Sequence, residues 1–103
     1  MLRFELINSK EMDKYVGNKH AMIIDVRDKT EFNEMHIADA VNIPIEKLEA
    51  MYDKMPKDFI YVLYCNGGGT GILAAKELFD RGHITRALLG GINAYDGNYI
   101  ESE

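Results

Sequence analysis

The chain has 103 residues, of which 47% are hydrophobic and 28% are charged, a composition typical of one globular domain with an apolar core. Its net charge of −5 argues against nucleic acid or an anionic membrane surface as a partner, because both attract clusters of Lys and Arg. We find no apolar stretch long enough for a transmembrane helix and no signal-peptide pattern at the N-terminus. The single cysteine excludes an internal disulfide, so a reducing cytoplasm is the expected location.

The first half of the chain alternates predicted strands and helices. Asn8 or Ser9 is expected to cap the first helix and Thr30 the second, while Pro56 ends the third. The continuous apolar run over 21–26 predicts a strand that is buried on both faces. The predicted strands of the first half are residues 4–7, 21–26 and 40–43. The predicted helices that follow them in turn are residues 9–16, 30–34 and 46–55.

The second half predicts a strand over 60–64, a helix over 70–81 that Gly82 ends, a strand over 86–89 and a short helix over 91–98. The inner face of the long helix is predicted to comprise Ile72, Leu73, Ala75, Leu78 and Phe79. The alternation predicts a single α/β domain, residues 1–103, with a mostly parallel sheet and helices on both faces. In such sheets the binding crevice lies beyond the carboxyl ends of the strands.

Cys65 follows the most strand-like stretch and precedes a glycine loop and the long helix. A helix N-terminus offers unpaired N–H groups and a positive dipole end, which together favour a thiolate, the nucleophilic form of cysteine. Glycines allow several backbone amides to turn toward one anion. We therefore predict that Cys65 is the catalytic residue. The predicted binding residues, through their amides, are Asn66, Gly67, Gly68, Gly69, Thr70 and Gly71; the Thr70 hydroxyl either donates a further hydrogen bond or caps the helix.

Three segments in this order resemble the rhodanese-like (sulfurtransferase) family in its small single-domain form, and the resemblance covers nearly the whole chain. The segments are Ile24-Asp25-Val26-Arg27 with Glu31-Phe32, His36-Ile37 and Ala40-Val41-Asn42-Ile43-Pro44; Tyr64-Cys65 with its loop, Ala74-Ala75, Leu78 and Gly82; and Leu89-Gly90-Gly91-Ile92-Asn93-Ala94-Tyr95.

The resemblance implies a cysteine that carries sulfane sulfur as a persulfide, with no cofactor. The donor would be thiosulfate or a polysulfide, and the acceptor cyanide or a thiol, including that of a thiol protein. Many relatives carry arginine where this chain has Thr70 and serine where it has Gly71, and no charged residue lies between Asp58 and Lys76. Because backbone amides alone would hold a dianion, we expect weak use of thiosulfate.

Other polar residues near the predicted site are given structural roles. We expect an ion-pair set near the sheet edge that comprises Asp25, Arg27 and Glu31. Resemblance and placement favour a hydrogen-bonded structural role for His36 over that of a general base. The remaining histidines, expected at the surface, are His20 and His83. Their spacing relative to Cys65 is not that of metal ligands, so we predict no metal.

Three other functions share part of this sequence pattern. A cysteine-dependent phosphatase would have a loop one residue longer that ends in arginine, and a P-loop would have a lysine after its glycines; neither is present. Residues 69–74 match a dinucleotide-binding fingerprint, but the acidic residue expected at the end of the next strand is missing. The alternative that stays open is a catalytically weak binding or regulatory module, in which Cys65 is a buried small residue and the glycines form a slack turn.

Overall fold

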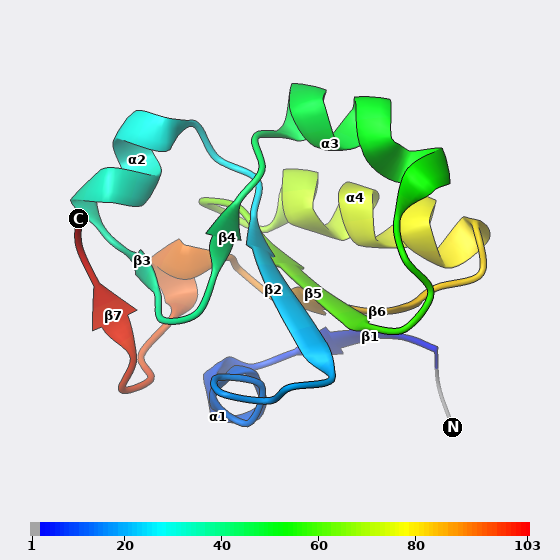
Figure 1. The fold of residues 1–103 in the computed structure, drawn as a ribbon. Helices are drawn as coiled ribbons and strands as arrows, with labels where there is room; N and C mark the ends of the chain where they lie inside the picture. The colour runs from blue at the N-terminus through cyan, green and yellow to red at the C-terminus, as the bar shows by residue number, and fades with distance from the viewer. Residues whose placement is uncertain (1–2) are drawn as a thin grey trace.

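The computed structural model describes residues 3–103, which form a parallel sheet with strand order β1-β6-β5-β2-β4 (Figure 1). All of its neighbouring strands pair in parallel, which confirms the predicted fold class. The strands of this sheet are β1 (Phe4–Ile7), β2 (Ala21–Asp25), β4 (Val41–Asn42), β5 (Ile60–Tyr64) and β6 (Ile84–Leu88). A separate antiparallel pair joins β3 (His36–Ile37) to β7 (Ile100–Glu101).

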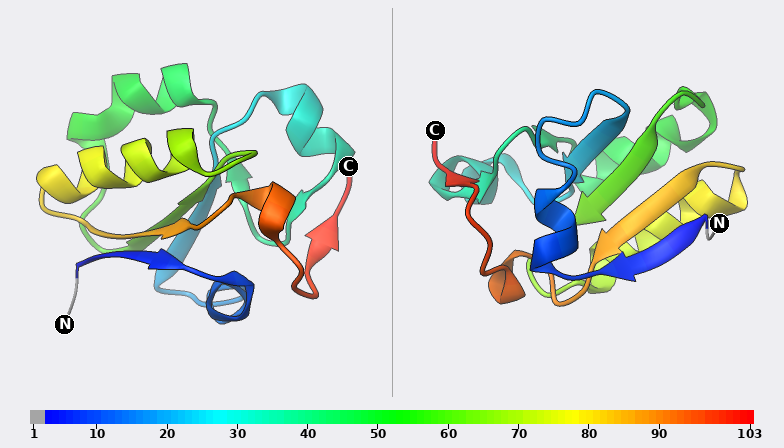
Figure 2. Two further views of the ribbon diagram at one scale, coloured as in Figure 1. Left: turned by 180° about the vertical axis from the view of Figure 1, so that it is seen from behind. Right: turned by 90° about the horizontal axis from the view of Figure 1, so that it is seen from below.

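Helices cover both faces of the sheet: α1 lies on one face, and α3 and α4 lie side by side on the other (Figure 2). The helices are α1 (Ser9–Asp13), α2 (Lys29–Glu34), α3 (Ile45–Met51) and α4 (Gly69–Asp80), with short 3-10 helices η1 (Tyr52–Lys54) and η2 (Ile92–Ala94). In the described range 3–103, no helix has both the length and the apolarity needed to span a membrane.

The central strands are buried on both faces because successive side chains belong to different cores. In β2, Ile24 packs under α3 and α4, whereas Ile23 packs with the core that includes Met12 of α1. In β5, Leu63 and Val62 divide in the same way. The two strands with continuous apolar sequences therefore lie in the middle of the sheet and are buried on both faces, as the sequence predicts.

Several predicted helix ends are wrong by a few residues. The first helix ends at Asp13 instead of Val16, although Asn8 does cap it through a reciprocal capping box with Glu11. Asp28, not Thr30, caps α2, because its carboxylate accepts the N–H group of Glu31 at 2.9 Å.

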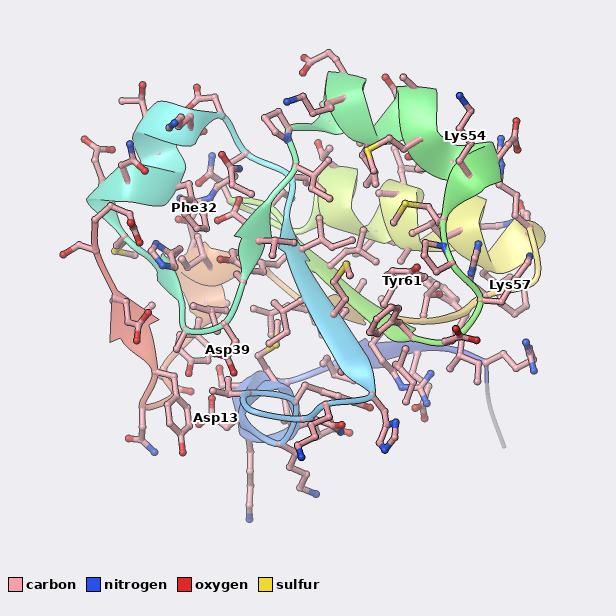
Figure 3. The ribbon with its side chains drawn as sticks, viewed as in Figure 1. Asp13, Phe32, Asp39, Lys54, Lys57 and Tyr61 are labelled. Carbon is pink, nitrogen blue, oxygen red and sulfur yellow. The ribbon has the colours of Figure 1, made fainter. Side chains whose placement is uncertain are left out.

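Three predictions of burial are also wrong, and one of them concerns Phe79, which was expected on the inner face of α4 but is 37% exposed. Leu73 of α4 is 69% exposed, and Ala74 is buried in its place, because the helix packs on β5 through its small residues. His83 is 3% exposed; its ring lies edge-on to that of Tyr61, which Figure 3 labels, with the centroids 5.2 Å apart. A turn position next to Gly82 therefore does not place His83 at the surface. His20, in contrast, is exposed, as predicted.

Candidate active site

Cys65 lies directly after β5, and α4 begins four residues later, so a short loop places the thiol at the helix N-terminus. Its Sγ accepts the N–H groups of Gly68 at 3.1 Å and Gly71 at 3.3 Å. Gly68 is the N-cap residue, with a φ of 106°, and no side chain caps the helix. The sulfur thus occupies the position that a capping oxygen usually takes, and backbone donors would stabilise negative charge on it.

The loop is held from behind by the segment after β6. The N–H groups of Ile92 and Asn93 donate to the carbonyl oxygens of Cys65 and Asn66 at 2.9 and 3.0 Å. Gly91 makes this approach possible: it has a φ of 62°, and a Cβ there would lie 2.4 Å from the Asn66 oxygen. The glycine pair before Ile92 is therefore a support of the cysteine loop, a role that its position in the third motif signalled but that sequence reasoning did not assign.

A buried ion pair borders the loop. The carboxylate of Asp25 is fully buried, and both of its oxygens lie 3.1 Å from Nε of Arg27 and share its single N–H group. Nη2 of Arg27 donates a further hydrogen bond at 2.8 Å. Burial lowers the pKa of Arg27 and the bonds to Asp25 raise it, with an upward net shift. Burial first, and then Asp25, raises the pKa of the neighbouring Tyr64 hydroxyl, which accepts the Ile37 N–H group. Asp25 and Arg27 thus form one buried neutral unit.

Glu31 does not join this ion pair, and in this respect the predicted set of three is wrong. Its carboxylate accepts a hydrogen bond of 2.6 Å from the side chain of Asn66, whose Oδ1 is 3.3 Å from Nη1 of Arg27. The Asn66 amide therefore bridges the arginine to the glutamate. This bridge orients the residue that follows Cys65.

The thiol opens into a pocket of about 330 Å³. Arg27 is the only cationic residue that lines it, and Glu31 adds a carboxylate. Lys54 and Lys57 lie at the end of the molecule opposite to Phe32 of α2 (Figure 3), and neither lines this pocket. The walls include Val26 and Ile45. Sequence reasoning assigned neither to the site, although Val26 belongs to the first motif, because an apolar side chain gives no sign of a chemical role. The residues brought together here from the predicted set are Arg27, Glu31, Cys65, Asn66, Gly67, Gly69 and Thr70.

His36 does not line the pocket. It is buried and stacks on Phe32 with ring centroids 3.9 Å apart, and its Nδ1 lies 2.8 Å from the Phe32 carbonyl oxygen. Its Nε2 lies 3.5 Å from the carboxylate of Glu103 and 3.8 Å from that of Glu101, next to β7. The contacts are those of a structural histidine. No group of three potential metal ligands occurs within residues 3–103.

The comparisons with known proteins agree with this architecture. The family model of the Rhodanese-like domain matches residues 8–98, so the chain belongs to the rhodanese-like domain family. It is 26% identical to the thiosulfate sulfurtransferase GlpE of Coxiella burnetii, covering 99% of this chain and 96% of that protein. A solved rhodanese-related protein from Thermoplasma volcanium superposes with a TM-score of 0.84 at 26% identity, covering 96% of this chain and 99% of the other.

A longer relative is matched over only part of its length. The tRNA sulfurtransferase of Desulfurococcus amylolyticus is 32% identical over 87 residues, which is 84% of this chain and 17% of that protein. Relatives that carry the name sulfurtransferase at low identity thus place the chain in a family of sulfur-transferring domains.

Proposed function

We propose that this protein is a rhodanese-type sulfurtransferase in which Cys65 carries sulfane sulfur as a persulfide. The observation that carries the proposal is the convergence of the Gly68 and Gly71 N–H groups on Sγ at the floor of an open pocket. Such donors cost no reorganisation when charge develops on sulfur. The family membership supports the same chemistry.

The first half-reaction loads the sulfur. The Cys65 thiolate attacks the outer sulfur of a donor, a new S–S bond forms at Sγ, and the donor's own S–S bond breaks. The electron pair of that bond leaves with the rest of the donor, as sulfite from thiosulfate or as a polysulfide shorter by one sulfur. The outer sulfur of the persulfide is then the anion that the amides of residues 66–71 would stabilise.

The second half-reaction unloads it. An acceptor thiolate, or cyanide, attacks the outer sulfur, and the bond to Sγ breaks so that the Cys65 thiolate is regenerated. The described residues hold no second thiol, because Cys65 is the only cysteine. The acceptor is therefore another molecule, and the reducing cytoplasm is the compartment we propose, since it supplies thiols and keeps Cys65 reduced.

Thiosulfate is expected to be the weaker donor. The one cation of the pocket, Arg27, is already bonded to Asp25, and Glu31 opposes a second negative charge. A compact dianion therefore gains little beyond the backbone amides. A longer polysulfide keeps its far charged end outside the pocket, so it is expected to load Cys65 faster.

The test is the intact mass of the reduced protein after exposure to polysulfide and, separately, to thiosulfate. The proposal expects a gain of one sulfur that a reductant removes and that the Cys65→Ser variant does not show. Faster loading by polysulfide is expected from the charge of the pocket. If neither donor adds sulfur to folded protein, the proposal fails and the binding-module alternative takes its place.

A further inference from the structure

A second pocket, of about 570 Å³, lies between α3 and α4, the two helices that run side by side above the sheet (Figure 1). It shares the lining residues Ile45 and Thr70 with the pocket of Cys65, so the two hollows adjoin one another. We call this second hollow the α3–α4 groove. A molecule that reaches the thiol from this side must pass along it.

The floor of the α3–α4 groove is apolar. Tyr52 and Ala74 are buried there, and Leu73 stands at its edge with 69% of its surface exposed, more than any other large hydrophobic residue in 3–103. One exposed leucine needs no explanation by itself. Beside a reactive thiol, however, an exposed leucine above a shallow apolar floor is a contact point for an apolar side chain of a partner.

The rim of the groove is acidic. Arg81 is bonded to the carboxylates of Asp53 and Glu77, both at 2.8 Å, so its charge is neutralised. Glu49 has no hydrogen-bonded or ionic partner among residues 3–103. Burial and then Glu49 and Glu77 raise the pKa of the Tyr52 hydroxyl, which reflects the same negative surroundings. The groove is thus lined by two carboxylates, Glu49 and Glu77, and one guanidinium that is already paired, so its complement is a cationic partner.

We propose that the α3–α4 groove binds the segment flanking the reactive thiol of a protein acceptor, with an apolar side chain against Leu73 and a Lys or Arg side chain against Glu49. The proposal rests on the proposed function and names the partner class of the same site. Its basis is the position of the groove next to the thiol pocket, with two lining residues in common, and the acidic rim. The same rim disfavours small thiols that carry net negative charge.

The test uses synthetic peptides with one cysteine, a leucine and a lysine, and a matched peptide with glutamate in place of the lysine. Protein loaded with sulfur from polysulfide is mixed with each peptide, and sulfur transfer is followed by mass. The lysine peptide is expected to react about tenfold faster than its partner. Glu49→Lys should reverse this preference, and Leu73→Gln should slow both peptides. The matched controls, Glu34→Lys on α2 and Leu89→Gln after β6, should change neither rate.

A second readout does not depend on sulfur transfer. Binding of the fluorescent lysine peptide, its cysteine replaced by serine, to the Cys65→Ser protein should weaken about tenfold in Glu49→Lys and stay unchanged in Glu34→Lys. Equal binding of both peptides, or equal effects of test and control variants, would overturn the inference while sulfur loading at Cys65 left the proposed function intact. If no sulfur is loaded on Cys65 but peptide binding depends on charge, the proposed function is overturned and the inference about the groove stands.

Discussion

The two ends of α4 are stabilised in different ways. At the carboxyl end, the N–H groups of Gly82 and His83 donate to the carbonyl oxygens of Phe79 and Leu78, respectively. These are the two hydrogen bonds of a Schellman motif, and Gly82 has the positive φ that this motif requires. At the amino end no side-chain oxygen caps the helix, and two N–H groups point at the sulfur of Cys65. The carbonyl groups of the carboxyl end are thus paired within the protein, whereas the amino end directs two N–H groups at a reactive side chain.

The arginines near the two ends of α4 differ in the burial of their ion pairs. Arg27 is buried against the fully buried Asp25 beside the thiol pocket. Arg81 lies at the carboxyl end and pairs with the exposed carboxylates of Asp53 and Glu77. A buried charge that loses its partner is costly, but an exposed one is simply solvated. The amino end of α4 should therefore be far more sensitive to substitution than the carboxyl end.

The largest effect is expected from Arg27→Met, which leaves the carboxylate of Asp25 buried without its guanidinium. The free energy of unfolding should fall by about 3–5 kcal/mol. Urea denaturation of the variant, beside Arg81→Met as a control with much smaller loss, measures the difference. Equal losses of unfolding free energy in the two variants would mean that the buried ion pair stabilises the protein no more than the exposed one does.

Gly91→Ala is expected to come next. The new methyl group would meet the carbonyl oxygens of Asn66 and Cys65 at 2.4 and 2.5 Å, at a φ of 62° that alanine rarely adopts. We expect a loss of about 2–4 kcal/mol in unfolding free energy and slower sulfur loading. Gly67→Ala is the matched control, because no atom lies within 4 Å of a Cβ there; it should unfold like the parent protein. A Gly91→Ala variant as stable as this control would contradict the close approach.

Local signals explain why much of the fold could be predicted. The strands over 4–7 and 60–64 were predicted with the bounds that the structure shows, because apolar, β-branched and aromatic residues mark them and turn residues follow. The pair β3–β7 was missed, since two-residue strands joined across the length of the chain leave no periodic pattern. The helix expected over 91–98 is reduced to η2, because the chain is held there by its contacts with the cysteine loop.

Only part of the candidate active site could be predicted from the sequence. The order of strand, Cys65, glycines and helix places a thiol at a helix N-terminus, and this could be seen directly. Two features are consequences of tertiary packing: the choice of the amides that point at Sγ, and the bridge that Asn66 makes between Arg27 and Glu31. The burial of His83 also depends on how α4 and β5 pack, which a turn residue beside Gly82 does not reveal.

Asn66→Ala tests a second contribution at the amino end of α4, because it removes the bridge from Arg27 to Glu31 and leaves the buried ion pair of Arg27 with Asp25 in place. We expect a loss of about 1–2 kcal/mol in stability and roughly tenfold slower loading of Cys65 by polysulfide. The control is Asn18→Ala, which removes an asparagine whose side chain accepts a hydrogen bond in an exposed turn. If loading slows equally in both variants, the bridge does not position the loop.

The smallest effect concerns pH and the carboxyl end. Burial, and then Lys57, lower the pKa of His83 from 6.5. Below about pH 6.5 the unfolded chain therefore binds a proton that the folded protein resists, so the free energy of unfolding should fall as the pH drops through this value toward the folded pKa. His83→Gln should lose this part of the pH dependence, and His20→Gln, a change at an exposed position, should keep it. Urea midpoints measured near pH 7.5 and near pH 5 compare the variants. Unaltered pH dependence in His83→Gln would show that the buried ring is not its source.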